Sequence, residues 1–440
     1  MKVIVMCGGI GKRMLPLTKD KSLLQFSGNP LIVHQINCAI AAGITDFIII
    51  SNPENIDAIR TALSPLNNIR INYAVQEKPL GMANALLSAA SLIGQEPFIL
   101  VSSNDIFNTT AYNQLLGEYT TGNDFIAYIT ALRVQDYFPG GYLKVKDDNE
   151  IEHIIEKPVK GEEPSDLINI VIHLYKEPEI LFNYLSTTES TSDDIYEKSL
   201  DRMIRDGYKL KAIPYKETWQ AIKYPWHILN TMDYFAKSTE QRISPSSRVS
   251  EKAVIDGNVV LEDNVRVFEG AVIRGPSYIG PNSIIGNGVL IRDSSIGNDC
   301  VVGYGTEIKH SYIGNGCWFH SNYIGDSVIE DDCSFGAGAI TANFRLDETT
   351  INSRIGKERI NTGQDKLGAI IGKGCRIGIN SSIMPGITIG ANSFVGAHIN
   401  LTHNLEAGKI ALSKSEYMVM PNLWSLSENK RQGLMEKLKE

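Results

Sequence analysis

A strict six-residue repeat of aliphatic residues constrains the fold of this chain more than any other feature. The repeat occurs in two blocks. The first contains Val249, Ile255, Leu261, Val267, Ile273, Ile279, Ile285 and Ile291, and the later one contains Ile371, Ile377, Ile383, Ile389 and Val395. Such a period indicates a solenoid. Each step would form one short strand of a triangular coil with its aliphatic side chain pointing inward, so that stacked coils bury a continuous core.

The remainder of the chain has a different pattern. Before about residue 240, short apolar strands such as Val3 to Met6 alternate with helical segments such as Leu31 to Ala42, which predicts an α/β domain with a mostly parallel sheet. Residues Asp347 to Lys366 are charged and lack the period, so we expect them to loop out of the coil. The predicted domains are an α/β domain at 1–240, a β-helix at 241–411 and a tail with a short helix at 412–440.

Charge and cysteine usage narrow the class of partners. The 42 Lys and Arg against 50 Asp and Glu give a net charge of −8, which favours small-molecule substrates over nucleic acid or an anionic membrane. Apolar runs are far shorter than the roughly 20 residues of a membrane span. The six cysteines are scattered without C-x-x-C spacing, which predicts a reduced, cytoplasmic protein.

A glycine-rich loop follows the first predicted strand and contains Gly8, Gly9, Gly11 and Arg13. Glycines let a backbone close on a phosphate chain, and an arginine offers it a fork of donors. Position 14 is Met, so the third glycine of a dinucleotide fingerprint is missing. The loop therefore predicts phosphate binding and disfavours a dinucleotide cofactor.

The segment from Cys7 to Thr18 resembles the signature loop of sugar-1-phosphate nucleotidylyltransferases, and further matches follow in that family's order. The resemblance implies a Rossmann-like, GT-A-like α/β nucleotidyltransferase domain. It implies that Arg13 is catalytic, that Gln76 and Gly81 read the base, and that Asp105, at the end of strand Phe98 to Val101, holds Mg²⁺. The implied sugar and sugar-phosphate contacts are Gly141, Glu156, Lys157 and Asn169.

Two departures from that family concern charge at the reaction centre. The loop after Thr18 is shortened, which leaves Lys21 as the substitute for the family's phosphate-binding, catalytic lysine. Ala221 stands in the segment Trp219 to Pro225 where the family has a second metal carboxylate. Each change could cost several kcal/mol of transition-state stabilisation, by analogy with about 3 to 4 kcal/mol for one lost electrostatic group.

The repeat is broken around His320 to Asn343, and this stretch resembles the acetyltransferase half of bifunctional glucosamine-1-phosphate acetyltransferase/uridylyltransferases, archaeal members included. The resemblance implies a left-handed parallel β-helix of hexapeptide repeats and a homotrimer with acetyl-CoA between neighbouring subunits. His320 matches the general base, for which a neutral imidazole is suited near pH 7. Arg292 and Lys309 match the cations that hold the sugar phosphate, and Tyr323 and Asn343 match sugar and acetyl contacts.

The leading prediction is a bifunctional transferase. It would N-acetylate an amino-sugar 1-phosphate with acetyl-CoA and couple a sugar 1-phosphate to an NTP, UTP first, with Mg²⁺, giving a nucleotide-sugar such as UDP-N-acetylglucosamine. Ala221 keeps open an acetyltransferase whose N-terminal domain only binds a nucleotide-sugar. A β-helix that serves only as an assembly scaffold is a third possibility, against which the His320 to Asn343 pattern argues. Taken singly, His320, Arg292 and Lys309 could also be solvated corner residues.

Overall fold

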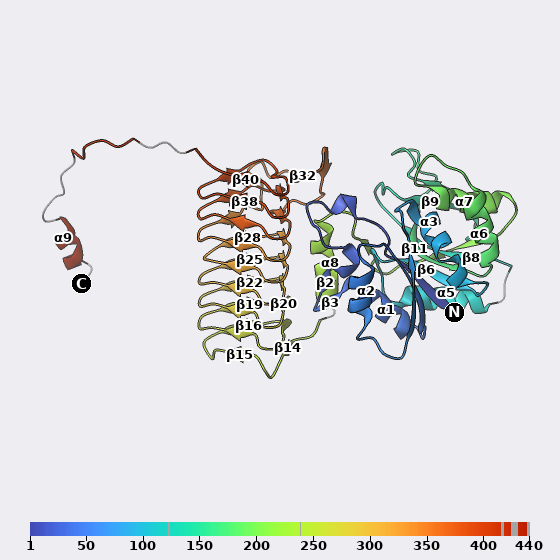
Figure 1. Cartoon of the computed structure of the whole chain (residues 1–440), viewed down its shortest axis with the longest axis horizontal. Helices are drawn as coiled ribbons and strands as arrows, with labels where there is room; N and C mark the ends of the chain where they lie inside the picture. The colour runs from blue at the N-terminus through green and yellow to red at the C-terminus, as the bar shows by residue number, and fades with distance from the viewer. Residues whose placement is uncertain (122–123, 238, 415–417, 424–429, 438–440) are drawn as a thin grey trace.

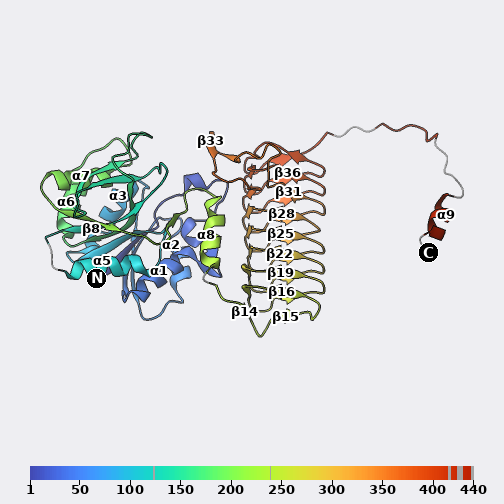
Figure 2. The same cartoon turned by 180° about the vertical axis from the view of Figure 1, so that it is seen from behind.

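The computed structural model describes residues 1–121, 124–237, 239–414, 418–423 and 430–437. An α/β part lies beside a prism of stacked strands, and the hairpin β32–β33 leaves the prism near its C-terminal end (Figure 1). The view from behind shows α8 (His227–Ala236) between the central sheet and the prism (Figure 2). The two parts therefore meet along one side of the prism.

The α/β part is built on a mixed nine-stranded sheet. Strands β5, β4, β1 and β6 run parallel, and β11 follows antiparallel to β6. The strands are β1 Lys2–Met6, β4 Asp46–Ser51, β5 Arg70–Val75, β6 Phe98–Ser102, β8 Ala127–Arg133, β9 Gly141–Val145, β10 Ile151–Glu156, β11 Leu167–Tyr175 and β12 Leu210–Pro214. The expectation of a mostly parallel sheet is thus wrong for the β8 to β11 half. There β9 and β10 are joined by a tight turn, which only antiparallel neighbours allow.

Helices cover both faces of this sheet. An apolar cluster packs against each face. The one on the first face includes the fully buried Ile36 and Leu115, and the one on the second includes the fully buried Leu86 and Leu200. The first face carries α1 Leu31–Ala41, α2 Ile56–Leu63 and α5 Thr109–Thr120, and the second carries α3 Gly81–Ser88, α4 Ala90–Ile93, α6 Pro178–Thr187 and α7 Ile195–Arg205. Strands buried on both sides explain the continuous apolar runs of β4 and β6.

The C-terminal part is a left-handed parallel β-helix whose three faces are parallel sheets. One face contains β14 Arg242–Ile243, β17 Val259–Leu261, β20 Ser277–Ile279, β23 Ser295–Ile296, β26 Tyr312–Ile313, β29 Val328–Ile329, β34 Ile370–Ile371 and β37 Thr388–Ile389. The second contains β15 Arg248–Val249, β18 Arg266–Val267, β21 Ile284–Ile285, β24 Val301–Val302, β27 Trp318–Phe319, β30 Ser334–Phe335, β35 Arg376–Ile377, β38 Phe394–Val395 and β40 Ile410–Ala411. The third contains β16 Val254–Asp256, β19 Val272–Arg274, β22 Leu290–Arg292, β25 Glu307–Lys309, β28 Tyr323–Gly325, β31 Ile340–Thr341, β36 Ser382–Ile383 and β39 Asn400–Leu401.

The periodic aliphatic residues fill the prism, as the sequence predicts. Ile273, Ile291 and Ile308 are fully buried one above the other on neighbouring rungs. Four cysteines form a second internal row, in which each Sγ donates to a backbone carbonyl of the next rung at 3.1–3.3 Å. These are Cys300, Cys317, Cys333 and Cys375, and all six cysteines of the chain are free thiols.

A fourth apolar cluster joins the two parts. Met14 and Leu17 of the N-terminal loop pack with Val328 and Ile370 of the first prism face, and Trp226 is buried among them. The aperiodic segment leaves the prism as the antiparallel hairpin of β32 (Asn352–Ile355) and β33 (Glu358–Asn361). In the tail, α9 spans Lys430–Lys437.

No helix in the described part of the chain combines the length and the apolar character that crossing a membrane requires.

Candidate functional site

The glycine-rich loop lines a cavity of about 560 Å³ at the carboxyl end of β1. Gly11 adopts a left-handed conformation (φ 59°), which starts the short 3₁₀ helix Lys12–Met14 and turns Arg13 along the cavity. The structure brings these residues of the sequence prediction together around the cavity: Gly8, Gly9, Gly11, Arg13, Lys21, Gln76, Gly81, Asp105 and Lys157. The remaining predicted N-terminal residues, Gly141, Glu156 and Asn169, do not line it.

Gln76 bridges the loop and the start of α3. Its Nε2 donates to the carbonyl of Gly81 and to Oδ1 of Asn84, both at 3.0 Å. A Cβ on Gly8 would lie 2.3 Å from the Gln76 Oε1, so only glycine lets the loop approach this amide. Gln76 thereby links the glycine-rich loop to Gly81, and all three line the cavity.

Asp105 is the buried carboxylate of the cavity, and Ala221 lies directly across from it. The short strands β7 (Asp105–Ile106) and β13 (Gln220–Ala221) are antiparallel, with Ala221 paired to Asp105. Trp219 Nε1 donates to Asp105 Oδ1 at 3.2 Å, and burial raises the pKa of Asp105 to about 6. Within the described ranges, no group of three or more Asp, Glu, His or Cys side chains could hold a metal. Asp105 alone supplies too few ligands for a metal ion. A cation would therefore bind here only if phosphate groups of a ligand completed its coordination.

Two lysines surround Asp105 with positive charge. Lys21 Nζ lies 3.4 Å from the Ile222 carbonyl, and burial lowers the pKa of its ammonium. Lys223, which the sequence reasoning missed, donates to the Pro139 carbonyl at 3.0 Å, and its ammonium lies 3.6 Å from the centre of the Phe138 ring. Burial lowers the pKa of Lys223 to about 8. Lys223 lies two residues after Ala221, in the segment that resembles the family, and this position could have identified it as a site residue.

The predicted sugar contacts form two adjoining groups. A Cβ on Gly141 would lie 2.8 Å from Asn169 Oδ1, so these two residues touch across β9 and β11. Glu156 and Lys157 form an ion pair of 2.5 Å and line a neighbouring cavity of about 150 Å³. Glu197 of α7 lines it too, and burial followed by the charge of Glu156 raises the pKa of Glu197 to about 8.

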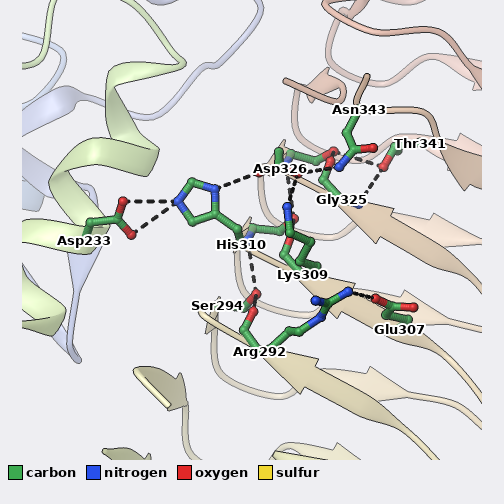
Figure 3. Close-up of polar contacts among 12 residues, drawn as sticks. Asp233, Arg292, Ser294, Glu307, Lys309, His310, Gly325, Asp326, Thr341 and Asn343 are labelled. Carbon is green, nitrogen blue, oxygen red and sulfur yellow. Dashed lines mark hydrogen bonds and ion pairs between the residues drawn. The ribbon is translucent and has the colours of Figure 1, made fainter. Parts of the chain in front are cut away.

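On the prism, Arg292 and Lys309 lie one above the other. Strands β22 and β25 pair Arg292 with Lys309, and β28 places Gly325 on the next rung (Figure 3). Arg292 forms an ion pair with Glu307. Lys309 Nζ lies 2.9 Å from Asp326 Oδ2. Two cations on neighbouring strands of a parallel sheet can both contact one phosphate group.

Asp326 connects this pair of cations to the α/β part. It also accepts from Asn343, and from Nδ1 of His310 at 2.9 Å (Figure 3). Burial opposes its charge, but these hydrogen bonds outweigh burial and hold the pKa of Asp326 below its ordinary value. His310 Nε2 lies 3.2 Å from both carboxylate oxygens of Asp233 on α8. Hydrogen bonds to Asp233 and Asp326 raise the pKa of His310 to about 9.

His320 is exposed at the corner between β27 and β28, one rung from Lys309. The buried side chain of Asn322 fixes this corner. Its Oδ1 accepts from the His320 backbone N–H at 2.5 Å, and its Nδ2 donates to the carbonyls of Gly336 and Ala339 on the next rung. Asn322 therefore fixes the backbone from which the exposed side chain of His320 extends.

The side chains of Tyr323 and Asn343 both pack directly against the backbone of Gly325. A Cβ on Gly325 would lie 2.7 Å from both the Tyr323 hydroxyl and Asn343 Nδ2. Sequence reasoning did not single out Asp326, Asn322 or His310. Asp326 lies within the His320 to Asn343 stretch that resembles the acetyltransferases, which could have identified it, whereas nothing in the sequence connects His310 with Asp233.

The two parts match two family models. Residues 2–222 match the nucleotidyl transferase model, and residues 258–293 and 368–398 match the bacterial transferase hexapeptide (six repeats) model. A mannose-1-phosphate guanyltransferase from Hypocrea jecorina is 26% identical over 276 residues, which are 61% of this chain and 73% of that protein.

Two relatives match nearly the whole chain. The bifunctional protein GlmU of Methanococcus vannielii is 29% identical over 438 residues, covering 95% of this chain and 99% of that protein. A bifunctional sugar-1-phosphate nucleotidylyltransferase/acetyltransferase of Sulfurisphaera tokodaii is 31% identical over 424 residues, covering 91% of this chain and 97% of the relative. The chain therefore belongs to the family of bifunctional transferases that join a nucleotidyltransferase domain to a hexapeptide-repeat acetyltransferase domain.

Proposed function

We propose that the prism N-acetylates an amino-sugar 1-phosphate of the glucosamine type with acetyl-CoA. The observation that carries this proposal is the column of Arg292, Lys309 and Gly325 beside the exposed His320. The two cations hold the phosphate of the sugar, and Tyr323 and Asn343, which pack against Gly325, contact its ring. The amine nitrogen attacks the thioester carbonyl, His320 takes the amine proton, and the thiolate of coenzyme A leaves.

The α/β part transfers a nucleotidyl group from an NTP to a sugar 1-phosphate, with UTP as the first candidate. A phosphate oxygen of the sugar attacks the α-phosphorus, and pyrophosphate leaves. Arg13, Lys21 and Lys223 line the cavity and neutralise the charge of the two anions. Mg²⁺ would be held by Asp105 and by the phosphates, where it supplies further charge neutralisation.

A homotrimer with acetyl-CoA between neighbouring prisms is the assembly that we propose. On the second prism face, one register position runs through Trp318, Ser334, Arg376, Phe394 and Ile410. Its three apolar side chains, Trp318, Phe394 and Ile410, have exposed fractions of 51%, 48% and 58%. Association would bury these three side chains. Size-exclusion chromatography with light scattering measures the assembly, and a monomer would contradict it.

The free thiols support a reducing, cytoplasmic location, which fractionation of the source cells would test.

His320→Ala tests acetyl transfer, measured as release of free thiol from acetyl-CoA with glucosamine 1-phosphate. We expect a loss of at least about 10²-fold, as for removal of a general base, with an unchanged melting temperature. His403→Ala is a matched control, because His403 is also exposed on the prism and its side chain shares a hydrogen bond with the neighbouring Thr402. Full activity of His320→Ala would overturn the assignment. Pyrophosphate release with each NTP and the acetylated product tests the second reaction.

A second candidate function for the α/β part is binding of a nucleotide-sugar without turnover. The pairing of Ala221 with Asp105 favours it, because the second carboxylate position is a methyl group. Calorimetric titration with UDP-N-acetylglucosamine, together with an absence of pyrophosphate release for every NTP, would select this candidate. Steady turnover with any NTP would reject it.

A further inference from the structure

Glu330 is a buried carboxylate of the prism whose partners lie mainly in the other part of the molecule. It follows β29 and is 5% exposed. Its Oε1 accepts from the Thr18 backbone N–H and hydroxyl, both at 2.9 Å, and from the Lys19 N–H at 2.5 Å. Its Oε2 accepts from Thr18 N–H at 3.0 Å and from Lys373 N–H at 2.8 Å. One prism side chain thus binds two consecutive residues of the N-terminal loop.

Other contacts bring the same loop against the prism. Lys19 Nζ forms an ion pair with Asp331 at 2.8 Å. A Cβ on Gly372 would lie 2.7 Å from the carbonyl oxygen of Pro16, so the loop backbone comes as close to this rung as a glycine allows. Met14 and Leu17 pack in the apolar cluster between the two parts. The loop is therefore docked on the prism along its length.

The docked segment connects the cationic residues of the nucleotide cavity. Arg13 precedes it and Lys21 follows it, and both line the cavity with Asp105. A second cavity of about 340 Å³ borders the segment and is lined by Thr18, Lys19 and Glu330 among others. Because that space is open, no packing there would hold the segment in place if the carboxylate were removed. At Thr18 and the Lys19 backbone, the hydrogen bonds to Glu330 are the contacts that hold the segment on the prism.

We propose that Glu330 is a positioning residue for nucleotidyl transfer: a carboxylate of the acetyltransferase prism holds the loop that presents Arg13 and Lys21 to the phosphates. This inference rests on the nucleotidyl transfer proposed above. It makes the activity of the α/β part dependent on a side chain of the β-helix. A displacement of about 1 Å at such a loop can cost about 10²-fold in rate.

The test compares Glu330→Ala and Glu330→Gln in the full-length protein. Asp332→Asn is the matched control, because Asp332 lies two residues further on, its side chain is 55% exposed, and its ion-pair partner is Lys373 rather than the loop. In Glu330→Ala, kcat for nucleotidyl transfer should fall at least about tenfold, while acetyl transfer stays within about twofold of the parent. Glu330→Gln keeps one acceptor oxygen for Thr18 but places an NH₂ group against the backbone N–H of Lys373, which is also a donor. Its kcat for nucleotidyl transfer should therefore fall less than that of Glu330→Ala.

Limited trypsin digestion supplies a readout that does not depend on turnover. Cleavage after Lys19 and Lys21 should accelerate in Glu330→Ala at least about tenfold and remain slow in Asp332→Asn. If the parent protein shows no pyrophosphate release, the proposed nucleotidyl transfer fails, and UTP affinity then replaces kcat as the second readout. Unchanged cleavage with unchanged kcat or UTP affinity would overturn the role of Glu330. An equal loss of acetyl transfer would also overturn it, because that result would indicate general destabilisation.

Discussion

The contact between His310 and Asp233 predicts a pH-dependent stability of the junction between the two parts. His310 is doubly paired, and its pKa lies at about 9 instead of the ordinary 6.5. At about 1.36 kcal/mol per pH unit, this difference corresponds to about 3 kcal/mol. Asp233 is 46% exposed, so screening by solvent reduces the expected contribution to about 1–2 kcal/mol.

The sign follows from the direction of the pKa change. The folded protein binds the His310 proton more tightly than the unfolded chain, so the stabilisation is complete below about pH 6.5 and is lost as the pH rises through about 9. His310→Asn should therefore lower the free energy of unfolding by about 1–2 kcal/mol at pH 6.5 and by much less at pH 10. Asparagine is chosen because residue 310 has a φ of 43°, which asparagine tolerates. Urea unfolding is followed by tryptophan fluorescence, since Trp226 is buried at the junction.

His398→Asn is the matched control, because His398 is exposed on the prism and has a similar φ of 56°. It should leave stability unchanged at both pH values. Asp233→Asn should reproduce most of the effect of His310→Asn, and the double variant should show that the two effects are not additive. The reasoning is refuted if His310→Asn costs the same at pH 6.5 and pH 10, or if the two substitutions act independently.

Three further substitutions test other parts of the structure. Gly325→Ala would place a methyl group 2.7 Å from the Tyr323 hydroxyl and from Asn343 Nδ2 and so displace both side chains. KM for the amino-sugar phosphate should therefore rise at least about tenfold without a change in circular dichroism, and an unaltered KM would count against sugar contacts by these two residues. Phe319→Ala removes a fully buried ring and should cost about 3–5 kcal/mol in urea unfolding. Lys223 carries its charge below about pH 8, so calorimetry should show UTP affinity falling between pH 7 and pH 9 in the parent and a weaker, flatter profile in Lys223→Met.

The sequence predicts those features that depend on local pattern. The aliphatic period identified the main inward row of the prism, because the same position of every six-residue strand-and-corner unit faces the core, as Ile291 does. The second inward row, to which Cys300 and Cys317 belong, was not predicted. Likewise Gly8, Lys21 and Asp105 line one cavity, since loops after parallel strands meet at the same sheet edge. The family assignment that these motifs suggested is confirmed by the comparisons.

What the sequence could not provide are contacts between distant segments. Glu330 reads as one more corner charge of the repeat, and only the docking of the loop at Thr18 turns it into a buried acceptor. His310 is likewise an ordinary corner residue until α8 brings Asp233 against it. The antiparallel placement of β11 was missed for a related reason, because apolar runs buried on both faces look alike in either direction.

The rung spacing of the prism restricts how such a chain can change its length during evolution. Val249 pairs with Val267, and Val267 pairs with Ile285, so one full circuit takes three repeats. Duplication of a complete circuit after Asn343 would lengthen the prism and leave every residue of the candidate acetyl-transfer site on its own wall. Gain or loss of a single repeat between Arg292 and Lys309 would turn all later strands onto the adjacent wall and separate these two cations, to which we assign phosphate binding. Viable insertions should therefore come as whole circuits, or as excursions such as β32–β33 that return to the position they left.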